Sequence, residues 1–417
     1  MKQAGEVNTI DQANLQAIQL IAQARVRWVD VLPASEALPV LRSKVLLHAG
    51  PPLDRGAMCA AMSSAAEGAL VYEGWARDLH HAGELLRNGG IQFHSAHDHG
   101  ALGPMAGIIS PSMPVLVLED GGSGNRSCVT INEGLGKTLR FGANDPTVLE
   151  RLRWIQRSLA PLLRDTLRAG GPVDITEIMA RSVQRGDECH NRNKSATSLL
   201  FRRLAPWMLR TEHSKGEIAE ALFFIDGNDH FFLNFSMAAT KASMDAVHRT
   251  RGGSLVSCMA ANGVEFGIKV VGSGERWFTA PAQKAEGRYF EGFSAADANP
   301  VMGDSYISEA AGLGGVAMAA APGIVQFIGG SVEEATQGTL EMYRITVAEH
   351  PLFKIPSLGF RGTPLGIDVR AVLRFQIRPL INTGIAHREP GVGQIGAGRF
   401  RPPMECFQEA AKQMRLT

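Results

Sequence analysis

Apolar and polar positions follow two different periods along the chain, and the dominant period changes twice. Between residues 10 and 145, short apolar runs typical of strands are separated by stretches with helical spacing, which predicts an α/β unit. We expect a first helix capped by Asp11. The predicted strands cover residues 45–48, 69–72, 91–93, 114–118 and 127–131.

The middle of the chain has helical spacing almost throughout. A helix is predicted over residues 146–170, with a kink or break at Pro161. Asp174 and Glu177 have the spacing of a helix start signal. Further helices are predicted over residues 187–209, 214–226 and 228–248.

Strand-like and helix-like patterns alternate again after residue 250. Strands are predicted at 255–260, 265–271, 324–328 and 378–382, and helices at 307–320, 332–348 and 404–415. The sequence therefore predicts a multi-domain α/β (α+β) protein with two α/β parts and a central helical domain. The expected boundaries are residues 1–145, 146–250 and 251–417, and a cleft between domains is the expected place for a site.

Composition narrows the class of protein. The chain has 42 basic and 41 acidic residues, so no nucleic-acid groove and no membrane surface are expected. Residues 310–332 carry no charge, but their six glycines indicate a buried helix followed by a strand rather than a membrane span. The five scattered cysteines and the absence of an apolar leader indicate a cytoplasmic protein without a disulfide framework.

Two cofactor motifs are present only as fragments, so no cofactor is expected. The stretch GVGQIG at 391–396 has the glycines of a dinucleotide loop, but no apolar strand precedes it. The stretch GLGKT at 134–138 resembles a phosphate loop, but Ile131 stands where that loop needs its first glycine.

A dense histidine cluster contains His94, His97 and His99 together with Asp98. Neutral imidazole is a common metal ligand, but no helical metal-binding signature surrounds these residues, and no metal is expected here. A polar ligand loop, an acid–base role and a structural role all remain open for the cluster. A metal-dependent amidohydrolase stays a minor alternative.

Two predicted helices carry polar residues that could line a cleft. On the helix over 228–248, His230, Asn234 and Lys241 lie within about 40° of one another. The helix predicted from residue 187 carries a second polar set that contains His190, Asn191 and Asn193. Each set is either a solvated face or the wall of a substrate cleft.

The C-terminal loop around residues 381–398 combines five residues suited to anion chemistry with many glycines. Arginine suits a carboxylate or phosphate, glycine lets backbone N–H groups approach an anion, and histidine moves protons near neutral pH. We expect His387, His97 or His230 to transfer the proton. The predicted substrate-binding residues of this and similar loops are Asn382, Thr383, Arg388, Arg276 and Arg361.

Several long motifs resemble those of one family, the YlbE-like family. The resemblance runs from about residue 10 to residue 407 and is carried by long motifs in the same order. These include LLHAGPP (46–52), HDHGALGPMAGIISPSMP (97–114), NEGLGKTLRFGA (132–143), GDECHNRN (186–193), NDHFFLNFSMAATKASMDA (228–246), GDSYISEAAGLGGVAMAAAP (303–322) and NTGIAHREPGVGQIGAG (382–398).

The resemblance implies a fold of two unusual α/β parts with a small helical part. It also implies a subunit of the oxamate carbamoyltransferase of anaerobic allantoin breakdown, which links oxalurate and phosphate with oxamate and carbamoyl phosphate. The implied partners are an FdrA-like subunit and a further small subunit, with a homo-oligomer as another open assembly. A non-catalytic scaffold subunit is the main alternative, because the resemblance carries over no set of catalytic residues.

Overall fold

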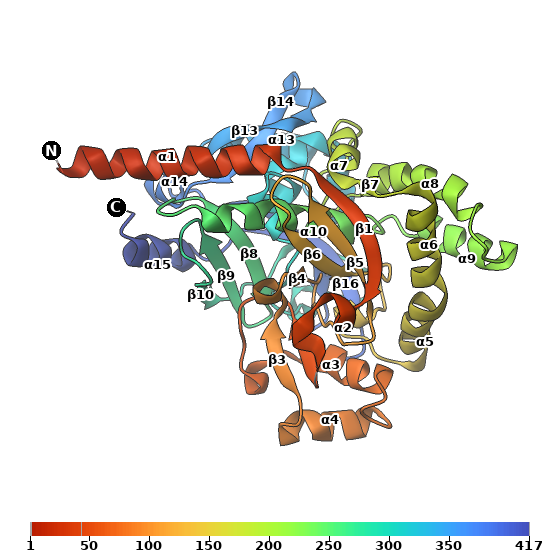
Figure 1. Ribbon diagram of the computed structural model, residues 1–417. Coiled ribbons are helices and arrows are strands. Elements are labelled where there is room, and N and C mark those ends of the chain that lie inside the picture. The colour runs from red at the N-terminus through yellow and green to blue at the C-terminus, as the bar shows by residue number, and fades with distance from the viewer. Residues whose placement is uncertain (1, 43, 417) are drawn as a thin grey trace.

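Helices and strands alternate along most of the chain in the computed structural model, which describes residues 2–42 and 44–416. Within these residues the strands form five small sheets, and helices cover them on several sides (Figure 1). The prediction of a mixed, multi-domain α/β (α+β) chain is confirmed.

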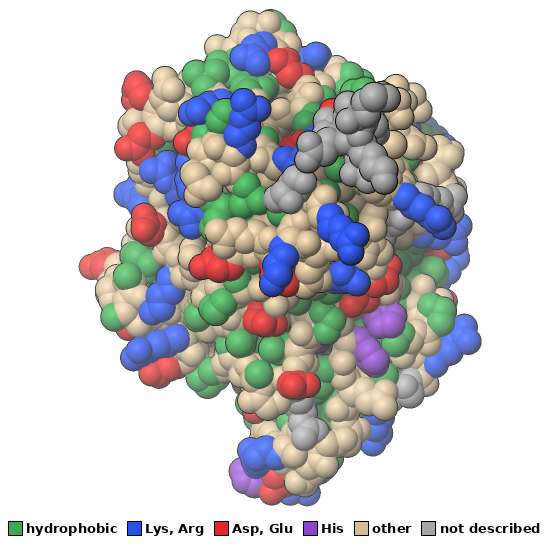
Figure 2. Space-filling view, turned by 90° about the vertical axis from the view of Figure 1, so that its left-hand side faces the viewer, with side chains coloured by type: hydrophobic (Ala, Val, Ile, Leu, Met, Phe, Trp, Pro, Cys, Tyr) green, Lys and Arg blue, Asp and Glu red, His purple; other side chains and the backbone are tan. Residues whose placement is uncertain are grey.

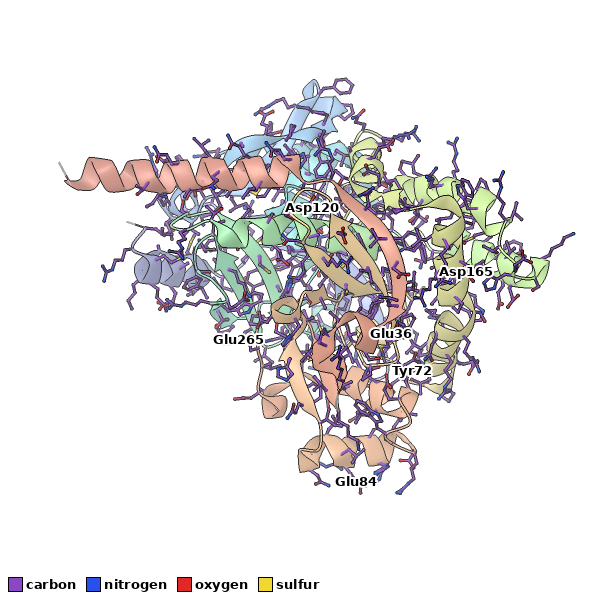
Figure 3. The ribbon with its side chains drawn as sticks, in the orientation of Figure 1. Glu36, Tyr72, Glu84, Asp120, Asp165 and Glu265 are labelled. Carbon is purple, nitrogen blue, oxygen red and sulfur yellow. The ribbon has the colours of Figure 1, made fainter. Side chains whose placement is uncertain are left out.

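The largest sheet lies in the N-terminal half and has the strand order β4-β6-β5-β1-β7. Its strands are β1 (Val26–Pro33), β4 (Ala101–Leu102), β5 (Pro114–Asp120), β6 (Arg126–Thr130) and β7 (Val173–Asp174). Asp120 closes the β5–β6 connection, because its carboxylate accepts hydrogen bonds from Arg25 and Ser123 (Figure 3). This contact also fixes the start of β1 beside β5.

One face of this sheet is covered by α10 (Leu233–Asp245), which packs against β5 and β6. Trp28 of β1 is fully buried there, with its ring 4.9 Å from that of Phe235. Burying two large aromatic side chains against each other contributes roughly 3–5 kcal/mol of hydrophobic stabilisation. The polar residues of α10 are therefore enclosed in protein.

A helical layer lies on the side away from the start of α1 (Figure 1). It consists of α5 (Pro146–Trp154), α6 (Ala160–Gly170), α7 (Ile175–Val183), α8 (Lys194–Met208) and α9 (Lys215–Asp226). A π-helical turn over 155–159 joins α5 to α6, and Pro161 lies in the first turn of α6. Asp174 caps α7, as its spacing to Glu177 predicts, and a Ser214–Glu217 capping box starts α9.

The C-terminal part contains three small antiparallel sheets, ordered β10-β9-β8-β12, β11-β16-β15 and β13-β14. Their strands are β8 (Val256–Asn262), β9 (Glu265–Val270), β10 (Phe278–Pro281), β11 (Glu286–Tyr289), β12 (Met302–Gly303), β13 (Thr346–Ile355), β14 (Arg361–Ile367), β15 (Ile381–Ala386) and β16 (Gln394–Phe400). The helices of this part are α11 (Ile307–Ala310), α12 (Val325–Ile328), α13 (Val332–Met342), α14 (Val369–Phe375) and α15 (Met404–Met414).

A smaller unit completes the N-terminal half. The parallel strands β2 (Val45–His48) and β3 (Gln92–Ser95) lie beside α3 (Ala60–Tyr72) and α4 (Leu79–Asn88) at the lower end in Figure 1. The short α2 (Ala34–Ala37) follows β1, and the long α1 (Lys2–Gln23) runs along the C-terminal sheets.

Several short apolar runs have a different structure from the one predicted. The run 69–72 is the last turn of α3, and 324–328 is helical rather than a strand. A run of four or five apolar residues fits a buried strand and a buried helix equally well, so the surrounding chain decides. The strand β1, which pairs antiparallel with β5, was not predicted.

Helix boundaries also differ from the prediction. Asp11 does not cap the first helix, because α1 already includes it; its carboxylate pairs with Arg370 at 2.7 Å. The predicted helix 187–209 begins only at Lys194, and the predicted helix 228–248 begins its α-helical part at Leu233. The helix predicted over 307–320 is interrupted after Ala310, and the helix predicted over 332–348 ends at Met342.

The hydrophobic cores draw on residues from all parts of the chain. One core joins Ile21 of α1 to Phe407 of α15, and another joins Leu46 of β2 to Met302 and Ala386. The boundaries at residues 145 and 250 stay a prediction. These shared cores do mean that loops from distant segments are held at fixed positions relative to one another.

No described helix has the length and apolar character needed to cross a membrane. The uncharged segment after residue 310 forms short buried helical turns instead. On the face shown in Figure 2, basic and acidic side chains are interspersed, as the near-zero net charge predicts.

Gly50 provides a test of the contact between the N-terminal and C-terminal sheets. It has φ +84°, and a Cβ atom there would lie 2.4 Å from the backbone carbon of Ala261 on β8. We expect Gly50→Ala to lower the free energy of unfolding by about 3 kcal/mol or more, from left-handed strain plus overpacking. Gly74→Ala is the matched control, because Gly74 has φ +70° in open space and should cost only about 1–2 kcal/mol. Equal denaturation midpoints for the two variants would contradict the close packing.

Candidate active site

Five glycine- and asparagine-rich loops that are far apart in the sequence meet beside α10. Asn228 donates to Asn132 at 3.3 Å, and the backbone of Gln394 donates to Gly136 at 3.1 Å. His190 Nδ1 lies 2.8 Å from Glu309 Oε1. The meeting segments are 132–140, 186–193, 228–232, 303–315 and 381–394, and each overlaps one of the long motifs of the sequence.

The segment 186–193 is a loop because its acidic side chains capture backbone donors. The Glu188 carboxylate accepts the N–H groups of His190 at 3.0 Å and Arg192 at 2.7 Å, and Asp187 accepts the N–H of Ala196. Side-chain acceptors of this kind compete with helical hydrogen bonds. Cys189 has φ +59°, a left-handed conformation that costs a non-glycine residue about 1–2 kcal/mol. The prediction that residues 187–193 form a helical face is therefore wrong.

A polar cavity of ≈ 250 Å³ opens where this loop meets the 228–232 turn. Three residues on its wall carry buried polar atoms with no hydrogen-bond partner among the described residues: Asn191 Nδ2, Asn193 Oδ1 and His230 Nδ1. Buried polar atoms are almost always hydrogen-bonded, so this set indicates a place for a polar ligand or water. The full lining is Leu135, Asn191, Arg192, Asn193, Lys194, Asp229, His230, Gly323, Ile324, Gln326 and Phe327.

Two cations lie at the rim of the polar cavity. Arg192 Nε donates to the carbonyl of Gly186 at 2.9 Å and lies 3.8 Å from Asp187. Lys194 Nζ lies 2.7 Å from Asp229, and both of these side chains are about half exposed. Cationic donors beside unpartnered amide and imidazole groups favour a small ligand that combines an anion with an amide or carbonyl group.

His230 is held as a neutral imidazole. Burial lowers the pKa of His230 to about 3, with a further contribution from the nearby positive charge of Arg140. Its ring packs 5.7 Å from that of Phe327, and its Nδ1 atom has no partner. A neutral ring of this kind offers a hydrogen-bond acceptor or a proton acceptor to a ligand, and an anion beside it would raise its pKa.

A buried cluster of ionisable groups lies directly behind this wall. Glu309 Oε1 accepts hydrogen bonds from the backbone of Gly315 and Asn382 as well as from His190. Burial lowers the pKa of His190, but the Glu309 carboxylate outweighs it and raises the pKa overall. Burial raises the pKa of Glu188 to about 8. Asn193 Nδ2 donates to the carbonyl of His190, which directs the Asn193 amide.

Asn382 and Thr383 lie on the C-terminal side of the same region. Both amide atoms of the Asn382 side chain are buried without a partner among the described residues. The Thr383 hydroxyl lies 3.0 Å from that of Tyr306. The structure therefore brings six predicted substrate-binding or catalytic residues into one region: Asn191, Asn193, His190, His230, Asn382 and Thr383.

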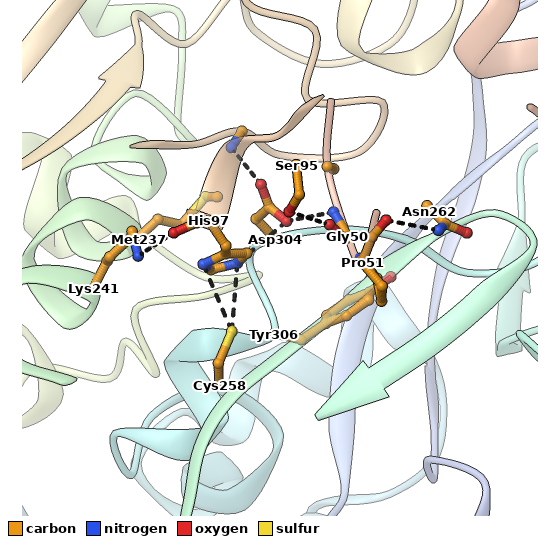
Figure 4. Close-up of polar contacts among 12 residues, drawn as sticks. Gly50, Pro51, Ser95, His97, Met237, Lys241, Cys258, Asn262, Asp304 and Tyr306 are labelled. Atoms are coloured by element: carbon orange, nitrogen blue, oxygen red, sulfur yellow. Dashed lines mark hydrogen bonds and ion pairs between the residues drawn. The ribbon is translucent and has the colours of Figure 1, made fainter. Parts of the chain in front are cut away.

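A second buried cluster surrounds Asp304 (Figure 4). Its carboxylate accepts the N–H groups of Gly50 at 2.7 Å and Gly103 at 2.9 Å, and it lies 3.2 Å from His97 Nε2. The Cys258 sulfur lies 3.6 Å from both ring nitrogens of His97. Burial lowers the pKa of His97, but Cys258 and Asp304 outweigh it and raise the pKa to about 9. His97 is thus part of an enclosed charge network.

The other members of the predicted histidine cluster point elsewhere. His94 and His99 contact each other with ring centroids 5.2 Å apart, and Asp98 pairs with Lys269 at 2.7 Å. Across residues 2–42 and 44–416, no three His, Cys, Asp or Glu side chains are grouped in a way that could hold a metal ion. The geometry gives the amidohydrolase alternative no support.

Lys241 and Asn234 have structural partners. Lys241 is 2% exposed, and its Nζ atom donates to the carbonyl of His97 at 3.1 Å and to Asp245. Asn234 bridges Asn132 and the carbonyl of Thr130, which ties α10 to β6. The polar stripe predicted on this helix is buried, and only its first member, His230, reaches the polar cavity.

The remaining predicted residues lie apart from the polar cavity and near the surface. Arg276 pairs with Gln413, and Arg361 pairs with Glu349 and stacks on Tyr343. Arg388 is exposed, and His387 Nδ1 accepts the N–H of Glu389. Their roles in anion binding and proton transfer stay predictions.

Comparison with known proteins gives the family. The model of the family described as oxamate carbamoyltransferase subunit AllG matches residues 91–305. A protein named oxamate carbamoyltransferase subunit AllG, from Escherichia coli (strain K12), is 47% identical over 97% of this chain and 98% of its own length. The chain belongs to this family. The resemblance expected from the motifs is confirmed.

Two other relatives carry no activity in their names. The uncharacterized protein YahG of Escherichia coli (strain K12) is 42% identical over 96% of this chain and 85% of its own length. The crystal structure of a conserved protein of unknown function from Enterococcus faecalis V583 has a TM-score of 0.96, with 43% identity and 99% of each chain covered. The whole fold is therefore shared with this solved structure.

Asp304→Asn tests the importance of the second cluster. The substitution places an amide N–H group against backbone donors or leaves His97 without its carboxylate, and removing one member of a buried charge pair costs about 3–5 kcal/mol. We expect a loss of that size in chemical denaturation. Glu119→Gln is the control, because that carboxylate forms a surface pair with Arg126. A loss below about 1 kcal/mol for Asp304→Asn, as expected for a surface pair, would show that the cluster is not a stabilising centre.

The raised pKa of His97 also predicts how stability depends on pH. Because its folded-state pKa is about 9, above the ordinary value of 6.5, its contribution is complete below pH 6.5 and is lost as the pH rises through 9. We expect wild-type stability to fall between pH 7 and pH 10, and His97→Gln to remove part of that slope. Parallel stability curves for the two proteins would contradict the assignment.

Proposed function

We propose that this chain is a subunit of a carbamoyltransferase that links oxamate and carbamoyl phosphate with oxalurate and phosphate. Family membership supports the reaction, because a relative with 47% identity over nearly its whole length is named for it. The relative YahG, at 42% identity, has no named activity, so the choice of acceptor is part of the proposal rather than of the family.

The observation that carries the proposal is the set of unpartnered groups on the polar cavity. Oxamate joins a primary amide to a carboxylate. Asn193 Oδ1 would accept an amide N–H, Asn191 Nδ2 would donate to a carbonyl oxygen, and Arg192 with Lys194 would hold the carboxylate or a phosphate. A half-open cavity of ≈ 250 Å³ has room for ligands of this size.

The chemistry needs a proton acceptor and a donor for developing charge. The amide nitrogen of oxamate attacks the carbamoyl carbon of carbamoyl phosphate, the C–O bond to phosphate breaks, and the nitrogen loses a proton. The neutral His230 is placed to take that proton, directly or through the departing phosphate. Asn191 Nδ2 would stabilise the negative charge on the carbamoyl oxygen in the transition state.

We further propose that the site is complete only in an assembly. The expected partners are an FdrA-like subunit and a further small subunit, and this chain contributes the anion-binding cavity to the shared site. Lys194 and Leu135 lie at the rim of the polar cavity and are about half exposed. A partner subunit that covered this rim would close the cavity. A purely scaffolding subunit would instead keep its cavity empty of substrate.

The test is oxalurate phosphorolysis, measured as carbamoyl phosphate formed by this chain alone and with its two partners. We expect activity in the assembled complex, and a loss of at least tenfold in kcat/KM for His230→Ala and for Asn193→Ala, because each removes one donor or acceptor from the reacting atoms. His80→Ala and Asn88→Ala are matched controls, since both residues are exposed on α4.

Two outcomes would count against the cavity. Wild-type activity in complexes that contain folded His230→Ala and Asn193→Ala proteins would refute it. A loss confined to His387→Ala and Arg388→Ala would place the site at the C-terminal loop instead. The scaffold alternative would be supported if the partner subunits without this chain bound oxamate or carbamoyl phosphate with the same affinity as the full complex.

A further inference from the structure

Three buried ionisable side chains, Glu188, His190 and Glu309, stand directly behind the polar cavity. Each is at most 1% exposed. His190 lies between the two carboxyl groups: its ring Nδ1 is 2.8 Å from Glu309 Oε1, and its backbone N–H donates to Glu188 Oε2 at 3.0 Å. His190 is followed directly by Asn191 on the cavity wall, so any charge in this cluster acts on a bound ligand at short range.

The charges of this cluster do not balance. Two carboxylates and one imidazolium leave a net charge of −1 in a place that water does not reach, and an uncompensated buried charge is costly. The Glu309 Oε1 atom accepts three hydrogen bonds, one of them from the imidazole, while its Oε2 atom is buried without a partner among the described residues. Both oxygens of Glu188 accept backbone N–H groups, but no described cation pairs with it directly as the His190 ring pairs with Glu309, so Glu188 is the member that we expect to gain the proton.

The surroundings do not supply a neutralising cation to Glu188. Burial raises the pKa of Glu188 to about 8, and the positive charge of His190 opposes this only in part. Asp187, on the same loop, is also buried, and burial raises its pKa to about 7. The charged or titratable groups around the cluster are Asp187, Cys189 and Arg192 on the same loop, Tyr306 before α11, and Asp229 and His230 on the neighbouring turn.

We propose that the polar cavity takes up its anionic ligand together with a proton, which is held on the buried Glu188–His190–Glu309 cluster. The inference rests on the proposed function of the cavity. An anion in the polar cavity and an ionised Glu188 on the loop that lines it repel each other, whereas a protonated Glu188 removes that repulsion. Glu188 is thus a positioning residue, which sets the charge of the loop that carries Asn191, Arg192 and Asn193.

The link between ligand binding and proton uptake gives the affinity a defined dependence on pH. Below pH 7 Glu188 already carries its proton, so this group adds little proton uptake and little pH dependence to ligand binding there. Above pH 8 the free protein loses the proton and must regain it on binding, so the affinity falls, by at most tenfold per pH unit for one linked proton.

The experiment is calorimetric titration with oxamate, whose carboxylate stays ionised throughout, at pH 7, 8 and 9 in buffers with different ionisation enthalpies. The protein is the full chain, alone and in its assembled complex. We expect proton uptake near zero at pH 7, rising to more than about half a proton per site at pH 9, together with a Kd that rises severalfold between pH 8 and 9. This measurement needs no variant.

The outcomes separate this inference from the proposed function. Oxamate binding without proton uptake at any pH overturns the inference and leaves the cavity as the binding site. No oxamate binding by the chain or the complex overturns the proposed function, and the inference with it.

A pair of variants identifies the group that holds the proton. Glu188→Gln, which keeps the shape and one acceptor oxygen, should make the Kd for oxamate constant between pH 8 and 9 and abolish the uptake. Glu220→Gln, an exposed glutamate of α9, should retain the wild-type profile. Wild-type proton uptake in a Glu188→Gln protein with an unchanged circular dichroism spectrum would overturn the assignment of the proton to Glu188.

Discussion

Two buried carboxylates on one short segment, Asp304 and Glu309, hold together the parts of the chain that form the site. A buried carboxylate must be surrounded by donors, because its desolvation costs several kcal/mol. Asp304 obtains them from Gly50, Gly103 and His97, all in the N-terminal half. Glu309 obtains them from His190 and from the backbone of Gly315 and Asn382. The segment therefore fixes segments from all three predicted domains at one point.

This constraint explains why the polar cavity can be rigid although loops form it. The 186–193 loop has no helical hydrogen bonds of its own, and Cys189 is held in a left-handed conformation. Glu309 anchors the loop through the His190 ring, Glu188 folds it around two backbone N–H groups, and the Ser236 hydroxyl holds the Cys189 carbonyl. With the backbone over-determined in this way, Asn191 and Asn193 are held in place and the Asn193 amide is oriented by the His190 carbonyl. A ligand in the proposed site would therefore meet a preformed wall, which is the usual condition for tight binding and for catalysis by positioning.

Periodicity was sufficient for elements whose form is decided locally. The helices α9 and α15 and the strands β5, β8 and β9 follow from hydrophobic spacing and caps, because no distant contact opposes those preferences. The loop at 186–193 could not be predicted in this way. Its helical spacing is real, but Asp187 and Glu188 accept backbone N–H groups, and that preference appears only when α8 and Glu309 are in place. The strand predicted at 69–72 was wrong for a simpler reason, because the length of a short apolar run does not distinguish a strand from a helix.

Some of the residues selected from the sequence lie at the polar cavity and others do not, and the difference has a physical cause. We selected His230, Asn191 and Asn193 because polar residues in otherwise apolar or motif-rich stretches must find hydrogen-bond partners. In the structure these three residues line the polar cavity. Arg276, Arg361 and Arg388 were selected for their chemistry alone, and exposed arginines find carboxylates, amides or solvent at the surface. Asp304 and Glu309 were missed because they lie within an apolar, glycine-rich stretch, and their importance comes from long-range donors that no local pattern contains.

The residues of the polar cavity fall into two sets, one that also holds the fold together and one that does not. Glu309, His190 and Glu188 are tied to several segments, so truncating one of these side chains disturbs the fold as well as the cavity wall. The outer lining is different: Leu135, Gln326 and Phe327 reach the polar cavity, and within the described part of the chain none of the three is hydrogen-bonded to Asp304 or Glu309. Changing their size or polarity would reshape the space beside Arg192 and Lys194 without removing the contacts of Asp304 or Glu309. If the cavity is the substrate site that we propose, its outer lining is where an acceptor larger or smaller than oxamate would be accommodated, while the inner wall would keep its amide and imidazole groups.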